Sequence, residues 1–196
     1  FAFVLGLCTL VAGLSGALQG ASADGVKPAR LVVDAETGKV LVADRANLPW
    51  YPASLTKLMT AYITFSEVAA GRLSLTDQIT VSAQAAGQPP TKFGFKTGQK
   101  ITVQQAATAM LVSSANDAAY ALAERIGGSA SSFIDRMNAA ALNLGMIGTH
   151  FQNPNGLPDD AQVTTARDVA VLALALIHNF PERYPMFSLR QVAIGG

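Results

Sequence analysis

The stretch Pro52–Lys57, which reads PASLTK, opens a long apolar segment and sets the start of a predicted helix. Proline suits the first turn of a helix, and the apolar residues that follow recur at helical spacing until Gly71 ends the run. These apolar positions are Leu55, Leu58, Met59, Tyr62 and Ile63. Lys57 is the only charged residue between Ala46 and Ser66, so its place at the head of this helix needs a physical reason.

Ser54 and Lys57 lie three positions apart, so a helix places both side chains on one face, with Cβ atoms about 5–6 Å apart. Unpaired N–H groups and the positive end of the helix dipole favour a developing oxyanion at this end. The same dipole, and an apolar setting without carboxylates, should lower the pKa of Lys57 from its reference value of about 10.4. A neutral lysine can deprotonate a serine hydroxyl and make it a nucleophile. The alternative is a lysine whose side chain extends to solvent.

A second candidate stretch, Ser114-Ala115-Asn116, lies between two predicted helices, in a loop that can face another element. The hydroxyl of Ser114 could relay a proton, and the amide of Asn116 could hold a substrate carbonyl. The alternative interpretation is a helix cap, because Ser, Asn and the following Asp117 are all favoured at cap positions.

Turn and cap residues divide the rest of the chain into short strands and helices. Alternating β-branched residues on either side of Gly38 predict a hairpin, Thr102 is a candidate N-cap, and Thr165 with Asp168 forms a capping-box pattern. Residues 148–164, GTHFQNPNGLPDDAQVT, form a turn-rich loop. The predicted strands cover about 30–34, 39–44, 75–81, 100–103 and 189–194, and the predicted helices cover about 53–70, 103–111, 116–127, 131–144 and 165–178.

Composition and charge exclude several classes of protein. With 196 residues, 50% of them hydrophobic, and a net charge of +1, the chain has enough apolar material for one compact globular domain. A near-neutral charge without a basic run gives no reason to expect nucleic acid as a partner. The single cysteine, Cys8, excludes a disulfide framework, and no clustered His, Asp or Glu pattern indicates a metal site or a cofactor.

Residues 1–23 are predicted to be a secretory signal whose charged start is missing. The segment is apolar and rich in small residues, and it ends in Ala21-Ser22-Ala23, a pattern typical of a cleavage site. An uncleaved membrane anchor is the alternative, although glycines and Gln19 interrupt the span of about 20 apolar residues that an anchor needs. The sequence therefore predicts export.

Three stretches taken together resemble a known family. They are PASLTK at 52–57, SSANDAAYALAERIGG at 113–128 and LGMIGTHFQNPNGLPDDAQVTTARDVAVL at 144–172. In this order they resemble the serine-type D-alanyl-D-alanine carboxypeptidases, the low-molecular-mass penicillin-binding proteins of peptidase family S11. The resemblance extends from about Ala29 to the C-terminus. It implies a mixed α/β fold of the β-lactamase/transpeptidase type, with an antiparallel sheet flanked by helices.

The resemblance also implies a role for each candidate residue. Ser54 would be the nucleophile that forms an acyl-enzyme, and Lys57 would be its general base. Ser114 would pass the proton toward the leaving D-alanine, and Asn116 would contact the substrate amide and help to fix Lys57. The implied partners are the pentapeptide stem of peptidoglycan and β-lactam antibiotics. The implied location is the periplasm or the outer face of the cytoplasmic membrane.

The third motif of the family, a Lys-Thr-Gly on a strand, is not where the resemblance requires it. Lys96-Thr97-Gly98 precedes the Ser-x-Asn loop instead of following it, so we expect a loop that leads into the strand at 100–103, with no catalytic role. We then expect the true motif beyond Gly196. Residues 24–196 would be a partial catalytic domain, truncated on the C-terminal side of its sheet and inactive alone. A missing C-terminal region could also provide peripheral membrane association.

Three other functions remain open. A class A β-lactamase shares the serine–lysine pair but needs a glutamate-held water, and the chain has no glutamate between positions 150 and 165. A catalytically silent relative could act as a peptidoglycan-binding scaffold, although a scaffold would not need all four candidate residues. A Ser-His-Asp hydrolase would need His150 or His178, which stand in a loop and near a helix end and are predicted to be structural.

Overall fold

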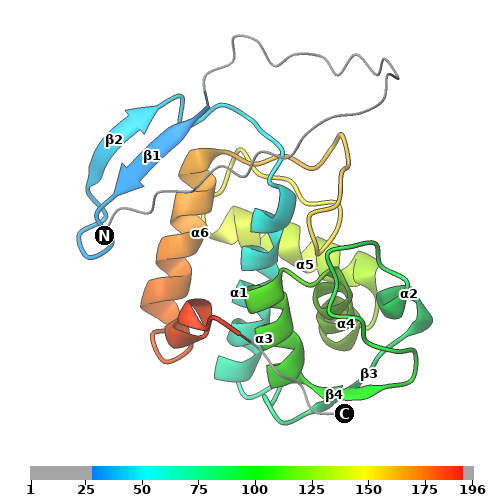
Figure 1. The fold of residues 1–196 in the computed structure, drawn as a ribbon. Helices are drawn as coiled ribbons and strands as arrows, with labels where there is room; N and C mark the ends of the chain where they lie inside the picture. The colour runs from blue at the N-terminus through cyan, green and yellow to red at the C-terminus, as the bar shows by residue number, and fades with distance from the viewer. Residues whose placement is uncertain (1–27, 192–196) are drawn as a thin grey trace, which may run out of the picture.

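The computed structural model describes residues 28–191, and the mixed α/β class is confirmed (Figure 1). The predicted signal at 1–23 and Cys8 lie outside the described residues. The strands are β1 (Arg30–Val33), β2 (Val40–Asp44), β3 (Gln78–Thr80) and β4 (Lys100–Thr102). The helices are α1 (Thr56–Ala69), α2 (Ala83–Ala86), α3 (Val103–Ser113), α4 (Asn116–Gly127), α5 (Ala130–Asn143) and α6 (Ala166–Asn179), with 3-10 turns η1 (Ala53–Leu55) and η2 (Tyr184–Ser188).

Helix α1 lies inside the helical body, where α3, α4, α5 and α6 all contact it (Figure 1). Its sequence, TKLMTAYITFSEVA, carries apolar or small residues around most of its circumference, which suits a buried helix. Met59, Ala61 and Phe65 are almost fully buried. The helix that carries Lys57 is therefore part of the core, so the lysine enters an apolar environment.

The strands β1 and β2 form the antiparallel hairpin that the sequence predicts, with Arg30 opposite Asp44. Gly38, between the strands, has a φ of +70°, which glycine adopts without strain. Helix α6 packs beside β1 (Figure 1). Four large apolar side chains of the hairpin are nevertheless exposed: Val32, Val40, Leu41 and Val42. Val32 and Val42 are paired across the two strands, so they share one face of the hairpin, and this apolar face is uncovered within the described residues.

The strands β3 and β4 pair at the end of the molecule away from the hairpin (Figure 1). Thr102 ends β4 and caps α3: its hydroxyl accepts from the Gln105 N–H, and the Gln105 side chain accepts from the Thr102 N–H. This reciprocal pair confirms Thr102 as the N-cap and fixes the direction in which α3 leaves the strand.

Several boundaries differ from the predicted ones. The helix predicted from Ala53 begins as the turn η1 and becomes α-helical only at Thr56, and α2 and η2 were not predicted. The antiparallel sheet is present as two separate two-stranded pairs within the described residues. The strand predicted over 189–194 is not formed at 189–191, and its remaining positions lie outside the described residues.

The capping-box prediction at Thr165 is half right. The Thr165 hydroxyl accepts from the Asp168 N–H at 3.1 Å and caps α6. The Asp168 carboxylate does not complete the box, because it accepts from the Gly148 N–H and the Thr149 hydroxyl, each at 2.8 Å. Asp168 is therefore used to hold the start of the 148–164 loop against α6.

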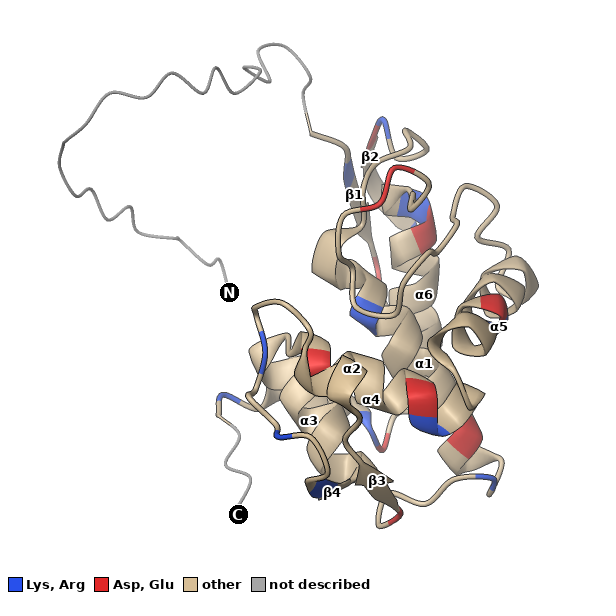
Figure 2. Cartoon of the chain, turned by 90° about the vertical axis from the view of Figure 1, so that its right-hand side faces the viewer, with Lys and Arg blue, Asp and Glu red and all other residues tan. Residues whose placement is uncertain are grey.

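The distribution of charge and the length of the helices concern the described part of the chain as a whole. In Figure 2 acidic and basic residues are interspersed among the elements, and no element carries a run of basic residues. Between residues 28 and 191, every helix is either too short or too polar to cross a bilayer.

Candidate active site

Ser54 stands in the turn η1, directly before α1, and its side chain is exposed. Pro52 is buried and fixes the entry into this turn, while Ala53 has a φ of +46°, a value that non-glycine residues rarely adopt. The Leu55 N–H bonds to the Pro52 carbonyl at 3.1 Å and closes the turn. The hydroxyl therefore sits at the N-terminal end of α1, open to a ligand, on a backbone that is locally strained.

Lys57 is 4% exposed, and its Nζ lies 3.2 Å from the Ser54 hydroxyl oxygen. Nζ also donates a hydrogen bond to the Asn155 carbonyl at 2.5 Å. Burial lowers the pKa of Lys57 from 10.5 to about 8, which confirms the predicted direction. Such a pKa leaves roughly a tenth of the amine neutral at pH 7. The amine is therefore within reach of the hydroxyl and close to the pKa of a usable base.

The loop at 148–164 supplies the carbonyl that holds Lys57. Asn153 keeps this loop in shape: its side-chain oxygen accepts from the N–H groups of Gly156 and Leu157 at 2.7 and 3.0 Å. Gln162, which is almost fully buried, accepts from the Asn153 N–H at 3.1 Å. The Thr60 hydroxyl donates to the Pro154 carbonyl at 2.7 Å and ties the loop to α1. The position of the Asn155 carbonyl is therefore fixed from several sides.

Gly156 makes the closest backbone approach to the turn that carries Ser54. A Cβ added at Gly156 would lie 1.9 Å from the Ala53 carbonyl oxygen and 2.9 Å from the Ser54 nitrogen. Its φ of +85° also favours glycine. The loop can support the turn at this distance only because position 156 has no side chain.

Ser114 and Asn116 occupy the junction between α3 and α4, as predicted, and Ser114 is in the left-handed conformation with a φ of 55°. Ser114 is the C-cap of α3 and Ala115 is the N-cap of α4, so the stretch does occupy cap positions, but in the described chain no side chain of Ser114 or Ala115 makes a capping hydrogen bond. The Asn116 side chain donates to the Pro89 carbonyl at 3.0 Å. Between residues 28 and 191 no hydrogen bond joins Ser114 or Asn116 to Lys57, so their roles in the reaction remain predictions.

Asp117 is a structural residue of the site that sequence reasoning treated only as a possible cap. It is fully buried, and its carboxylate accepts hydrogen bonds from the backbone N–H groups of Phe93, Gly94 and Phe95 at 2.9, 2.8 and 3.1 Å. Asn116 adds a bond from its own N–H to the Thr91 carbonyl at 2.8 Å. The first residues of α4 therefore clamp the segment 88–95 against the Ser-x-Asn loop.

The remaining candidates lie away from the serine–lysine pair. Lys96-Thr97-Gly98 forms an exposed turn that leads into β4, as predicted. His150 contacts Gln152 at 3.2 Å, and His178, in the last turn of α6, contacts the Ala35 carbonyl at 2.8 Å. Neither histidine reaches Ser54, which removes support for a Ser-His-Asp arrangement in the described chain.

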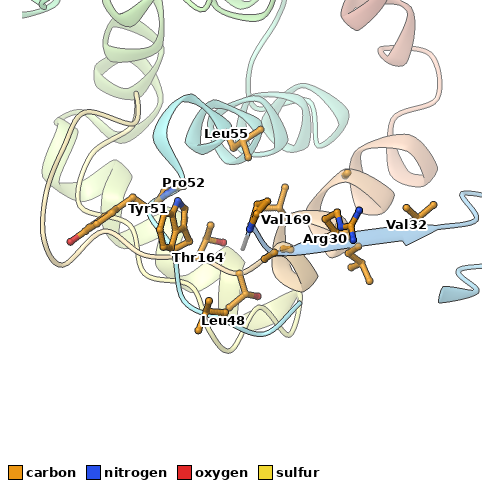
Figure 3. A pocket seen from close by; sticks show the side chains of 16 residues that line it. Arg30, Val32, Leu48, Tyr51, Pro52, Leu55, Thr164 and Val169 are labelled. Carbon is orange, nitrogen blue, oxygen red and sulfur yellow. The ribbon is translucent and has the colours of Figure 1, made fainter. Parts of the chain in front are cut away.

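Two cavities flank the turn that carries Ser54. One, of about 770 Å³, is mostly apolar and lies between the hairpin, α6 and the chain before η1; Pro52 and Leu55 reach it from the turn (Figure 3). The lining of the other, of about 320 Å³, includes Ala53, Gly156, Asp159 and Asp160. Neither cavity is lined by Lys57, so both lie beside the reactive pair.

Comparisons with known proteins identify the family of the chain. A family model described as D-alanyl-D-alanine carboxypeptidase matches residues 21–194. The D-alanyl-D-alanine carboxypeptidase DacC of Escherichia coli (strain K12) is 40% identical over 160 residues, which are 79% of this chain and 40% of that protein. The chain thus spans less than half the length of this curated relative.

Solved structures show the same fold. The crystal structure of the D-alanyl-D-alanine carboxypeptidase DacD from Francisella tularensis matches with a TM-score of 0.81 and 42% identity, over 86% of this chain and 43% of that one. The ampicillin-bound form of penicillin-binding protein D2 from Listeria monocytogenes matches with a TM-score of 0.70 and 32% identity, over 84% of this chain and 66% of that one. The predicted fold type is thereby confirmed, and the chain belongs to the family of D-alanyl-D-alanine carboxypeptidases.

Proposed function

We propose that this protein is a serine-type D-alanyl-D-alanine carboxypeptidase that removes the terminal D-alanine from peptidoglycan stem peptides. The observation that carries the proposal is the 3.2 Å contact between the Ser54 hydroxyl and the buried amine of Lys57. An exposed hydroxyl beside a lysine of lowered pKa is the arrangement that nucleophilic catalysis by serine requires. Membership of the family supports the choice of substrate.

In the first step, neutral Lys57 takes the proton of Ser54 while Oγ attacks the carbonyl carbon between the two terminal D-alanines. The new C–O bond gives a tetrahedral oxyanion, and we assign its stabilisation to the Ser54 N–H, because the Leu55 and Thr56 N–H groups already bond to backbone carbonyls of the turn. Asn155 assists because its carbonyl holds Nζ in line with Oγ. The direction of the Lys57–Ser54 hydrogen bond reverses when the amine is neutral, so that the hydroxyl donates.

In the second step, the C–N bond breaks and D-alanine leaves with a proton that Ser114 passes from Lys57. We assign this relay to Ser114 because membership of the family supports a role for the Ser-x-Asn stretch, which this chain carries in the junction between α3 and α4. Asn116 would bind the substrate amide. Water then hydrolyses the acyl-enzyme, with Lys57 again accepting the proton. A β-lactam would acylate Ser54 in the same way, as the ampicillin-bound relative suggests.

Further strands are expected to cover the open face of the hairpin. Val32 and Val42, which pair across the strands, are 48% and 46% exposed and together leave an apolar patch uncovered. DacC of Escherichia coli is more than twice as long as the region that it shares with this chain, and additional length of this kind could supply such strands, including a Lys-Thr-Gly motif. We also propose export to the periplasm or to the outer face of the cytoplasmic membrane, supported by the apolar segment at 1–23.

Peptide mapping by mass spectrometry tests the proposal. The full-length protein is treated with penicillin, and the tryptic peptide that contains Ser54 should gain the mass of the opened antibiotic. Ser54→Ala should abolish the adduct, while Ser66→Ala, on the far end of α1, should leave it unchanged. An adduct on another residue would contradict the assignment of Ser54. The absence of any adduct would favour the peptidoglycan-binding scaffold instead.

A further inference from the structure

One side-chain contact joins two parts of the site that lie far apart in the sequence. The Asn155 side-chain nitrogen donates to the Gln88 side-chain oxygen at 2.8 Å. Asn155 belongs to the 148–164 loop, whereas Gln88 follows helix α2, 67 residues earlier. Asn155 is 1% exposed, so its side of this bond is shielded from water, whereas Gln88 is half-buried.

Each end of the contact leads directly to a candidate residue. On one side the Asn155 carbonyl accepts from Lys57 Nζ at 2.5 Å. On the other side Gln88 is followed by Pro89, whose carbonyl accepts from the Asn116 side chain at 3.0 Å. A continuous path of hydrogen bonds and backbone therefore runs from the base, Lys57, through Asn155 and Gln88 to Asn116. No other side-chain hydrogen bond of the described residues joins the 148–164 loop to the segment 88–95.

The contact is poorly explained by stability alone. The second polar atom of the Asn155 side chain, Oδ1, is buried without a hydrogen-bond partner in the described chain. The cost of leaving a buried acceptor unsatisfied offsets the gain in folding free energy from one hydrogen bond. An apolar side chain of similar shape would fill this place at a lower cost in folding free energy. The asparagine is therefore better explained by the groups that it holds in position.

We propose that Asn155 and Gln88 are positioning residues that set where the Lys57 amine stands between Ser54 and the Ser-x-Asn loop. This inference rests on the proposed function of Ser54 and Lys57. The Asn155 side chain, anchored by Gln88, orients its own backbone carbonyl, and that carbonyl holds Nζ. Without the anchor the peptide of Asn155 can rotate, the amine loses its fixed acceptor, and water can enter beside it.

The test uses Gln88→Ala and Asn155→Ala in the full-length protein, with the rate constant of acylation by a fluorescent penicillin measured across a pH series. A displacement of the amine by about 1 Å predicts a loss of roughly tenfold to a hundredfold in each variant. Hydration of the amine predicts a pH midpoint that moves upward from about 8 toward 10.5. Because both changes break the same bond, the double variant should be no slower than the slower single variant.

Two further variants separate positioning from a general loss of structure. Gln88→Glu keeps an acceptor for Asn155 and should retain most of the rate. Gln84→Ala removes a neighbouring glutamine side chain whose only hydrogen bond in the described chain is a 3.4 Å contact with the Tyr120 hydroxyl, and it should acylate normally. Circular dichroism and thermal melting confirm that each protein is folded.

The inference is overturned if folded Gln88→Ala and Asn155→Ala acylate within twofold of the wild type, or lose rate without a change in the pH midpoint. Those results leave the proposed function intact as long as the wild type forms its adduct on Ser54. A wild type that forms no adduct would instead remove the proposed function itself. If the alanine variants fail to fold, Gln88→Glu is compared with Gln88→Met instead. The pH midpoint of acylation should then be normal in Gln88→Glu and raised in Gln88→Met.

Discussion

At the scale of single residues, the position of Ser54 depends on a neighbour that has no side chain. The turn η1 combines a left-handed Ala53 with an exposed serine, and Gly156 supports this turn through a direct backbone approach. Strain of this kind is kept only where the surroundings determine it fully, as they do around active sites. The nucleophile is therefore placed as much by the 148–164 loop as by its own helix.

Gly156→Ala should displace the Ser54 turn and lower the acylation rate constant by roughly a hundredfold, because the new Cβ would lie 1.9 Å from the Ala53 carbonyl oxygen. Gly71→Ala is the matched control: Gly71 also has a positive φ, of +70°, but no atom lies within 4 Å of its added Cβ. Both variants should lose some stability from backbone strain, and only Gly156→Ala should lose acylation. Equal acylation by the two folded variants would contradict the supporting role of Gly156.

At the scale of elements, the C-terminal half of α1 is anchored by one carboxylate. Glu67 is almost fully buried and receives hydrogen bonds from Arg72, in the turn after the helix, and from Arg136 on α5. The hydrogen bond from Arg72 has the largest effect on the pKa of Glu67. Together the two arginines hold this pKa below its ordinary value of 4.5, although burial acts in the opposite direction. Glu67 therefore fixes α1 relative to α5.

Glu67→Gln should lower the free energy of unfolding by about 1 kcal/mol near pH 7, a modest value because both arginines are partly exposed. Folding lowers the pKa of Glu67, so the contribution of this carboxylate to the free energy of unfolding is fully present above pH 4.5. The contribution disappears as the pH falls through the pKa of Glu67 in the folded protein. Urea denaturation from about pH 7 to about pH 3 should show the two proteins converging in acid. Glu182→Gln, in an exposed pair with Arg183, is the control, and a gap that persists in acid would argue against this role.

The elements that the sequence predicts correctly are those with local signals. Gly38 marks the hairpin, Thr102 caps α3, and the PASLTK stretch starts α1, each within a few residues of the element it controls. The contact between Lys57 and the Asn155 carbonyl spans 98 positions and uses a backbone atom that every residue has, so no side-chain pattern announces it. The Asp117 clamp was missed for a related reason, because an aspartate at a helix start is usually a cap.

At the scale of the whole molecule, the described chain separates a well-packed helical body from a hairpin that is covered on one side only (Figure 1). A two-stranded hairpin is marginally stable by itself, and an exposed strand edge invites pairing with another chain. The apolar face of the hairpin continues into the cavity of about 770 Å³ beside α6 (Figure 3). The helical body holds the reactive pair, and the hairpin face is where further structure would pack.

Protein made as residues 24–196 alone should therefore self-associate as its concentration rises. Val42→Lys, at a hairpin position that is 46% exposed and pairs with Val32, should reduce this association several-fold, because the added charge opposes burial of the apolar face. Ile147→Lys, at an isolated position that is 86% exposed, should have little effect. Sedimentation velocity at several concentrations measures the difference, and a monomer at all concentrations would show that the hairpin face needs no cover.

The central claim is that a buried Lys57 activates Ser54, and the pH dependence of acylation tests it most directly. The rate constant for acylation of the full-length protein by penicillin, measured from about pH 6 to about pH 10, should rise with pH and level off with a midpoint near 8. Lys57→Arg, which keeps a charge that cannot be lost in this range, should remove both the rise and most of the rate. A rate that does not change across this range, or a midpoint near the ordinary value of 10.5, would contradict the account.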